Sequence, residues 1–106
     1  MGDVAGAQQT YVSLLEINPN EPLGWFNLGN LLQRAERLSE AEEAYARAVS
    51  IDPSVERAHF YRARALILLN RIPEALEPAR RALELAPDDE LTRQMVRDLE
   101  QALGLR

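Results

Sequence analysis

The sequence predicts an all-α fold, a solenoid of about six antiparallel helices. Two observations support this prediction. The chain contains successive segments whose apolar residues recur at helical spacing, and the same residue types return with a fixed period of 34 that spans two such segments. The identical recurrences are Ala7, Ala41 and Ala75, and Pro19, Pro53 and Pro87. A period of this length with two helices per unit is typical of repeat arrays, in which each unit buries its apolar face against its neighbours.

The first two helices are expected over residues 3–17 and 21–34. The apolar stripe of the first consists of Val4, Ala7, Tyr11, Leu14 and Leu15. Pro19 ends this helix, and Asn20 and Pro22 provide a cap and a first-turn proline for the second. The packing face of the second helix consists of Trp25, Leu28, Gly29 and Leu32. A glycine inside a helix costs roughly 1 kcal/mol, so Gly29 is expected to have a packing reason.

The third helix is predicted to begin with a capping box, Ser-Glu-Ala-Glu, at residues 39–42. Its apolar positions are Ala41, Ala44, Tyr45, Ala48 and Val49. The acidic residues Glu40, Glu42 and Glu43 fall on the other side of this helix, where we expect them to be exposed to water.

The last three helices are expected over residues 54–69, from 73 onward and over 88–103. Ser54 and Asp88 are N-cap residue types, and Pro73 suits a first helical turn. Pro78 lies one turn later and removes a backbone hydrogen bond, so we predict a kink there. The last helix is predicted to cover the preceding hairpin with Leu91, Met95, Leu99 and Leu103 and to leave Arg93, Arg97, Asp98 and Glu100 in water.

The central unit, residues 22–53, resembles a tetratricopeptide repeat (TPR). The positions that carry the resemblance are Trp25, Leu28, Gly29, Ala41, Tyr45, Ala48 and Pro53. The next unit keeps Ala63, Ala75, Ala82 and Pro87, but His59, Arg62 and Ala79 replace an aromatic, a leucine and a tyrosine. The resemblance implies one right-handed solenoid domain, in which the backbone of the antiparallel partner helix passes close to Gly29. Its parts are a half repeat over residues 1–19, full repeats over 20–53 and 54–87, and a capping helix over 88–106.

Composition excludes several classes of function. The 106 residues amount to one domain, and the absence of cysteine excludes disulfides, thiolate metal sites and a cysteine nucleophile. A net charge of −5 argues against nucleic acid as a partner. The longest apolar run, residues 65–69, is too short to span a bilayer, and the first residues do not resemble a signal peptide. We therefore expect a cytoplasmic protein without membrane insertion.

Nothing in the sequence points to catalysis. His59 is the single histidine and stands at a packing position of the repeat, so it has no second histidine for a metal site. No nucleophile lies in an activating motif. We predict that the chain is not an enzyme and binds no cofactor or metal.

The resemblance implies that the first helix of each repeat lines a concave groove in which peptides lie. The predicted partner-binding residues on these helices are Asn27, Asn30, Arg34, Arg57, Phe60, Tyr61 and Arg64. Asparagine amides can pair with a peptide backbone, and arginine can bind a carboxylate through two parallel hydrogen bonds. We therefore expect a protein or peptide partner with acidic and apolar groups, held by a scaffold or adaptor. Phe26 and Phe60 occupy the place of the basic residue by which chaperone-binding TPR proteins clamp a terminal carboxylate, so we do not expect chaperone tails.

Two questions stay open at this point. The first helix lacks the partner that would precede it in a complete repeat, so the chain is either a piece of a longer array or pairs with a second copy. A structural self-assembly module, in which the first helix forms a homodimer through Tyr11 and Leu15, is accordingly the alternative function. Arg62 lies on an expected packing face, and either its stem extends to water or it pairs with an acid that spacing does not identify.

Overall fold

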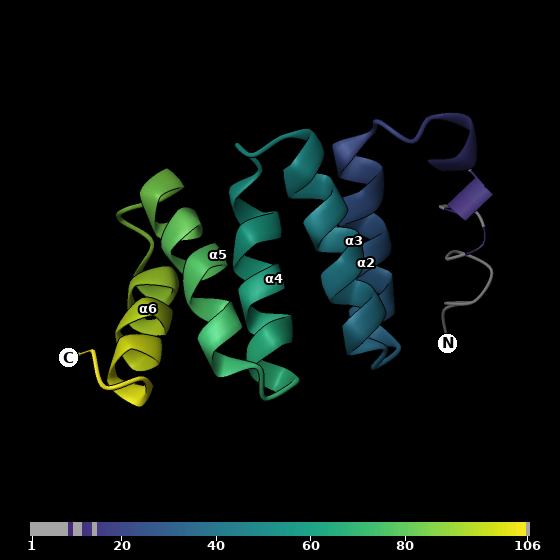
Figure 1. Ribbon diagram of the computed structural model, residues 1–106. Helices are drawn as coiled ribbons and strands as arrows, with labels where there is room; N and C mark the ends of the chain where they lie inside the picture. Colours follow the sequence, from purple (N-terminus) through teal and green to yellow (C-terminus); the bar gives the residue numbers. More distant parts are fainter. Residues whose placement is uncertain (1–8, 10–11, 14, 106) are drawn as a thin grey trace.

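The computed structural model describes residues 9, 12–13 and 15–105 and shows an all-α fold (Figure 1). The helices that are complete in the described part are α2 (Pro22–Arg34), α3 (Leu38–Ile51), α4 (Glu56–Leu68), α5 (Ile72–Leu85) and α6 (Glu90–Ala102). Each packs against the next along the chain, so that they stand side by side in a row. Residues 15–17 are also helical. Most of the helix predicted over residues 3–17, including Tyr11, lies outside the described residues.

The predicted N-cap of α3 is wrong. This helix begins at Leu38 without a capping box, because Arg37 is its N-cap residue and binds the carboxylate of Glu40 through Nε and Nη2, at 2.8 and 2.7 Å. An equivalent pair lies at the start of α5 in the next repeat, where Arg71 Nε donates to Glu74 at 3.0 Å. A two-bond arginine–carboxylate pair one turn apart thus stands where the sequence predicts side-chain capping.

The starts of α4, α6 and α2 differ from the prediction by smaller shifts. The helix α4 begins at Glu56 rather than at Ser54, whose hydroxyl donates to Asp52 in the preceding turn. The N-cap of α6 is Asp89 rather than Asp88, and that of α2 is Glu21 rather than Asn20. Hydroxyl and carboxylate side chains serve turns as well as caps, so residue type alone places a helix start only approximately.

The prolines behave largely as predicted. Pro22 and Pro73 lie in the first turns of α2 and α5. Pro78 is buried inside α5, which continues from Ile72 to Leu85 through it, and the kink itself stays a prediction.

The same type of turn follows α2 and α4. Glu36 and Asn70, which occupy the same position in successive repeats, adopt φ values of +61° and +60°, in the left-handed region. In the first turn, Glu36 N–H donates to the carbonyl of Gln33, and Arg37 N–H donates to the carbonyl of Leu32. This pair of hydrogen bonds is the Schellman arrangement, which reverses the chain so that the next helix runs antiparallel.

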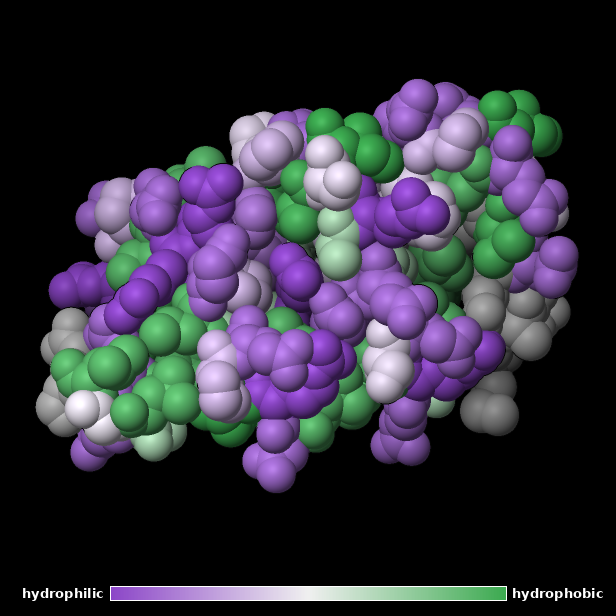
Figure 2. All heavy atoms as spheres, viewed as in Figure 1, coloured by the Kyte–Doolittle hydropathy of each residue, from purple (hydrophilic) through white to green (hydrophobic). Residues whose placement is uncertain are grey.

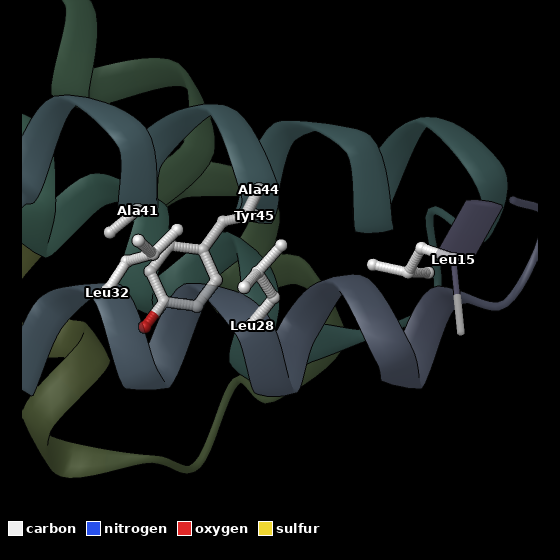
Figure 3. Close-up of a cluster of buried hydrophobic side chains, with 6 residues drawn as sticks. All are labelled: Leu15, Leu28, Leu32, Ala41, Ala44 and Tyr45. Atoms are coloured by element: carbon white, nitrogen blue, oxygen red, sulfur yellow. The ribbon is translucent and has the colours of Figure 1, made fainter. Parts of the chain in front are cut away.

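Tyr45 of α3 fills the space above Gly29 of α2. A Cβ atom at position 29 would lie 2.6 Å from Cε1 of the Tyr45 ring, so the tyrosine side chain, and not the partner's backbone as predicted, requires the glycine. Figure 3 shows the Tyr45 ring between the two helices, among Leu28, Leu32, Ala41 and Ala44.

Leu15 belongs to the same buried cluster and is 4% exposed. It packs inside the chain and is not available to a second copy, which removes one of the two residues on which the predicted homodimer was based.

His59 takes the structural place of Trp25 in the second repeat. Trp25 Nε1 donates to the carbonyl of Pro19 at 2.8 Å, and at the equivalent position of the next repeat His59 Nε2 lies 2.8 Å from the carbonyl of Pro53. His59 is also buried. Both rings thus join the start of a helix to the end of the preceding repeat, as expected for a packing position.

Arg62 of α4 pairs with Glu42 of α3, which answers the question that the sequence left open. The distance from Arg62 Nε to Glu42 Oε2 is 2.8 Å, and Arg71 Nη1 lies 3.8 Å from the other carboxylate oxygen. Glu42 is 8% exposed, so its predicted place in water is wrong. Two arginines from the following repeat lie beside this carboxylate and compensate its charge, which allows it to be buried.

The packing face of α6 also differs from the prediction. Thr92, Val96 and Leu99 are the buried residues of this helix, whereas Leu91 is 68% exposed. Glu100 was predicted to be in water, but its side chain is largely buried and its carboxylate accepts a hydrogen bond from Arg80 at 3.0 Å. Arg97, also expected in water, is partly buried. Leu91 therefore does not belong to the buried face of α6, whereas Leu99 is buried and Met95 packs against the core cluster, as predicted.

Candidate partner-binding groove

The residues predicted for the groove lie on α2 and α4, the first helices of the two full repeats. Asn27, Asn30 and Arg34 come from α2, and the remaining four come from α4. The spacings of three, four and seven positions place each set on one helix face. The structure packs the two aromatic members, Phe60 and Tyr61, into one cluster with Phe26 of α2. It uses the polar members Asn30 and Arg57 in contacts within the chain.

Four aromatic rings form one packed cluster between α2, α3 and α4. Tyr61 lies at its centre, with ring centroids 6.0 Å from Phe26, 6.0 Å from Tyr45 and 5.4 Å from Phe60. Phe60 is only 8% exposed. Phe26, Phe60 and Tyr61 thus form the floor between the helices, and they are not free anchors that stand out from the surface.

The two asparagines differ in what they have left to offer a partner. The Oδ1 atom of Asn30 lies 2.7 Å from the Tyr45 hydroxyl, which is also 2.9 Å from Gln33 Oε1. A phenol has one proton and donates to one acceptor at a time. Burial raises the pKa of this phenol, so it stays protonated. Asn30 can still present its amide N–H groups to a partner. Asn27 is partly buried, and the Tyr45 hydroxyl is not bonded to it.

The three arginines are not equivalent. Arg57 already binds Glu56 at 3.1 Å and Asp89 at 3.0 Å, and its guanidinium lies over the Phe60 ring at 4.8 Å. Arg34 and Arg64 are exposed and form no ion pair with any residue in the part of the chain that the structure describes. Arg64 and Arg34 are therefore available to bind a carboxylate of a partner, and Arg57 is less available because it is already paired.

An apolar cavity lies beside Arg64, between α4 and α6. Its volume is about 450 Å³, and we call it the α4–α6 groove. The side chains that matter for the argument are Phe60, Arg64 and Ile67 from α4 and Leu91, Met95 and Asp98 from α6. This volume falls within the range of roughly 300–1,000 Å³ that is usual for ligand sites.

Sequence reasoning missed the wall that α6 contributes to this groove. It assigned α6 to a capping role, although the repeat period was a sufficient signal. One repeat period takes Arg57, Tyr61 and Arg64 to Leu91, Met95 and Asp98. Residues at equivalent repeat positions face the same surface, so α6 is the third wall after α2 and α4.

Hydrophobic residues gather near this end of the molecule. Figure 2 shows them toward α6 and the C-terminal end, whereas hydrophilic residues cover much of α3–α5 on the same face. Of the exposed leucines on the first helices, Leu91 of α6 lies at this end and lines the cavity, whereas Leu23 lies on α2 and Leu68 on α4. Apolar side chains gathered on an open surface usually mark an interaction site.

The period, the helix pairs and the packing residues together decide the family. A profile described as tetratricopeptide repeat matches residues 1–56 and 26–90. The chain belongs to the TPR family. A comparison with curated proteins finds no match.

Solved TPR structures share the fold of this chain. The first TPR of Spaghetti (RPAP3), bound to the HSP90 peptide SRMEEVD, is 26% identical with a TM-score of 0.85, and the match covers 97% of this chain and 84% of that one. SycD, a type III secretion chaperone of Yersinia enterocolitica in complex with a peptide of the translocator YopD, is 17% identical with a TM-score of 0.87, covering 96% and 83%. MamA is 20% identical with a TM-score of 0.91, covering 98% of this TPR chain and 61% of MamA.

Two further findings concern the part of the chain that is described. Within residues 9, 12–13 and 15–105, no group of three or more histidine, cysteine, aspartate or glutamate side chains is arranged to hold a metal ion. None of the helices described there has the length and apolar character that are needed to cross a membrane.

Proposed function

We propose that this TPR domain is a protein–protein interaction module that holds a segment of a partner protein in the groove lined by α2, α4 and α6. The observation that carries the proposal is the α4–α6 groove of about 450 Å³, with Arg64 at its edge. Arg64 is exposed and has no acidic partner among the described residues. An apolar cavity beside a cation without an ion pair suits a ligand with an apolar side chain and a carboxylate.

The energetics favour such a ligand. Burial of one large aliphatic side chain contributes about 1.5–3 kcal/mol, and a charge-assisted hydrogen bond to arginine adds about 1.5–3 kcal/mol. Leu23, Leu68 and Leu91 offer apolar surface along the three walls.

Similar structures support this proposal. The first TPR of RPAP3 is bound to an HSP90 peptide, and SycD is in complex with a YopD peptide. The predicted roles of Asn27, Asn30 and Arg34 on the α2 wall belong to the proposal as contacts to the backbone and to acidic groups of the partner. Arg57, because it is already paired with Asp89, contributes less than Arg64.

Selection of peptides from a random library on the purified chain tests the proposal. We expect enrichment of peptides with apolar and acidic residues, and loss of that enrichment with Arg64→Glu. The matched control is Arg81→Glu on α5, where Arg81 is exposed and forms only a 3.7 Å pair with Glu84 one turn away. Absence of enriched peptides on the folded wild-type chain, or enrichment that Arg64→Glu does not alter, would overturn the groove as the binding site.

A further inference from the structure

One repeat position is neutral on α2, positive on α4 and negative on α6. Asn30 of α2, Arg64 of α4 and Asp98 of α6 are each separated by one repeat period, so they occupy the same place on successive first helices. Arg64 and Asp98 both line the α4–α6 groove. One wall of the cavity is therefore positive at this height and the other wall is negative.

The negative charge of Asp98 is also available to a partner. Its Oδ1 accepts a hydrogen bond from Gln94 Nε2 at 2.8 Å, which holds the carboxylate on the groove face of α6. No ion pair joins Asp98 to another side chain within residues 15–105. A hydrogen bond from a neutral amide leaves the charge uncompensated.

The rest of the groove is largely apolar. Ile67 on the α4 side and Leu91 and Met95 on the α6 side line the cavity. The α6 residues at the cavity run from Leu91 near the start of the helix to Ala102 at its end, and a helix rises about 1.5 Å per residue. The groove thus extends over several turns of α6, long enough for a short segment that lies along it.

This arrangement disfavours an acidic tail. A ligand with several carboxylates would place one negative charge near Arg64 and others near Asp98, and like charges that face each other lower affinity. A ligand with an apolar anchor, an acid on one side and a base on the other would satisfy both walls. The net charge of −5 acts in the same direction, because it repels acidic ligands at long range.

We infer that the α4–α6 groove recognises an internal partner segment with three features: an apolar anchor, an acidic residue that pairs with Arg64 and a basic residue that pairs with Asp98. This inference rests on the proposed function and specifies its partner. It assigns Leu91, Met95 and Asp98 to the site.

The test uses peptides with acetylated and amidated ends, selected on the wild-type chain, and copies of the tightest one in which glutamate replaces the basic residue. We expect the selected peptides to contain one base, one acid and one apolar residue and to bind at least about tenfold more tightly than these copies, a difference of about 1.4 kcal/mol. Asp98→Arg should weaken these peptides by about tenfold or more and select new ones in which an acid replaces the base. Glu77→Arg on the exposed side of α5 is the matched charge control and should leave affinity unchanged.

The outcomes separate this inference from the proposed function. If the copies with glutamate in place of the base bind as tightly as the selected peptides, or if Asp98→Arg does not change the selected motif while its thermal unfolding matches that of the wild type, the inference is wrong and the interaction module stands. If no peptide binds the folded chain at all, the proposed function fails first. The combined variant Arg64→Asp with Asp98→Arg gives a positive check, because it should prefer peptides with the order of acid and base reversed.

Discussion

The guanidinium of Arg62 donates to the carboxylate of Glu42 across the contact between α3 and α4, with an Nε–Oε2 distance of 2.8 Å. The pair connects the two full repeats. The equivalent of Arg62 in the first repeat is Leu28, and the equivalent of Glu42 in the second is Leu76. An ion pair has thus replaced two apolar packing positions at one junction of the array.

Removal of one member of this pair is expected to destabilise the chain more than removal of both. Arg62→Leu leaves the Glu42 carboxylate, 8% exposed, with only Arg71 at 3.8 Å, and should lower the free energy of unfolding by about 1–3 kcal/mol. Arg62→Leu with Glu42→Leu should be close to wild type. Urea unfolding of the four chains of this double-mutant cycle gives the coupling energy, and a coupling near zero would mean that the pair has no stabilising role.

Gly29→Ala is expected to destabilise the chain although alanine is the better helix former. The new Cβ would lie 2.6 Å from the Tyr45 ring, and overpacking costs about 1–3 kcal/mol, against about 1 kcal/mol gained in helix propensity. Gly24→Ala is the control, because the nearest atom to its new Cβ is the flexible Leu15 Cδ2 at 3.0 Å. Thermal unfolding should show a lower Tm for Gly29→Ala than for Gly24→Ala. Equal values would mean that the Tyr45 ring does not restrict this position.

Glu36→Gly is expected to stabilise the chain. Glu36 has a φ of +61°, and a residue with a Cβ pays about 1–2 kcal/mol for the left-handed region, which glycine adopts freely. We expect about 0.5–1 kcal/mol of additional stability, since glycine also gains entropy in the unfolded chain. Gly104→Ala, at a φ of +75°, is the converse substitution and should be destabilising. A loss of stability with Glu36→Gly in urea unfolding would contradict the turn described at this position.

Asp89 gives the chain an acid-dependent contribution to stability. Its pKa lies below the usual value because the Thr92 hydroxyl donates a hydrogen bond to the carboxylate and the Arg57 guanidinium is close. A lowered folded-state pKa means that this stability is fully present above the unfolded pKa of about 3.9 and is lost as the pH falls through the folded-state pKa. Unfolding free energies measured as the pH falls through this range should decline less steeply for Asp89→Asn than for wild type. Parallel curves would exclude this contribution.

The repeat period predicted more of the molecule than local residue types did. It located the helix pairs, and the resemblance to TPR repeats indicated the packing roles of Trp25, Tyr45 and His59. Helix starts were less accurate because side chains such as Ser54 bond to a turn as readily as to a helix end. The pair of Arg62 with Glu42 could not be predicted, since these residues are far apart in the sequence and only the packing of α3 on α4 brings them together.

Only the α2 and α4 sides of the groove were predicted from the sequence. The α2 and α4 walls followed from the resemblance to TPR arrays, but the assignment of α6 to a capping role concealed the third wall. Exposure of Leu91 and the place of Met95 and Asp98 follow from the same period. The internal use of Arg57 by Asp89 could not be predicted, because it depends on where the N-terminus of α6 meets α4.

The most direct test of the central claim is the location of a selected peptide on the chain by NMR. Titration of the labelled protein should shift the signals of Arg64 and Ile67 on α4 and of Leu91, Met95 and Asp98 on α6, the residues that line the groove. Signals of exposed residues on α5, such as Glu77 and Arg81, should stay in place. Shifts that are confined to α3 and α5, or that leave Met95 and Leu91 unchanged at saturation, would contradict the account.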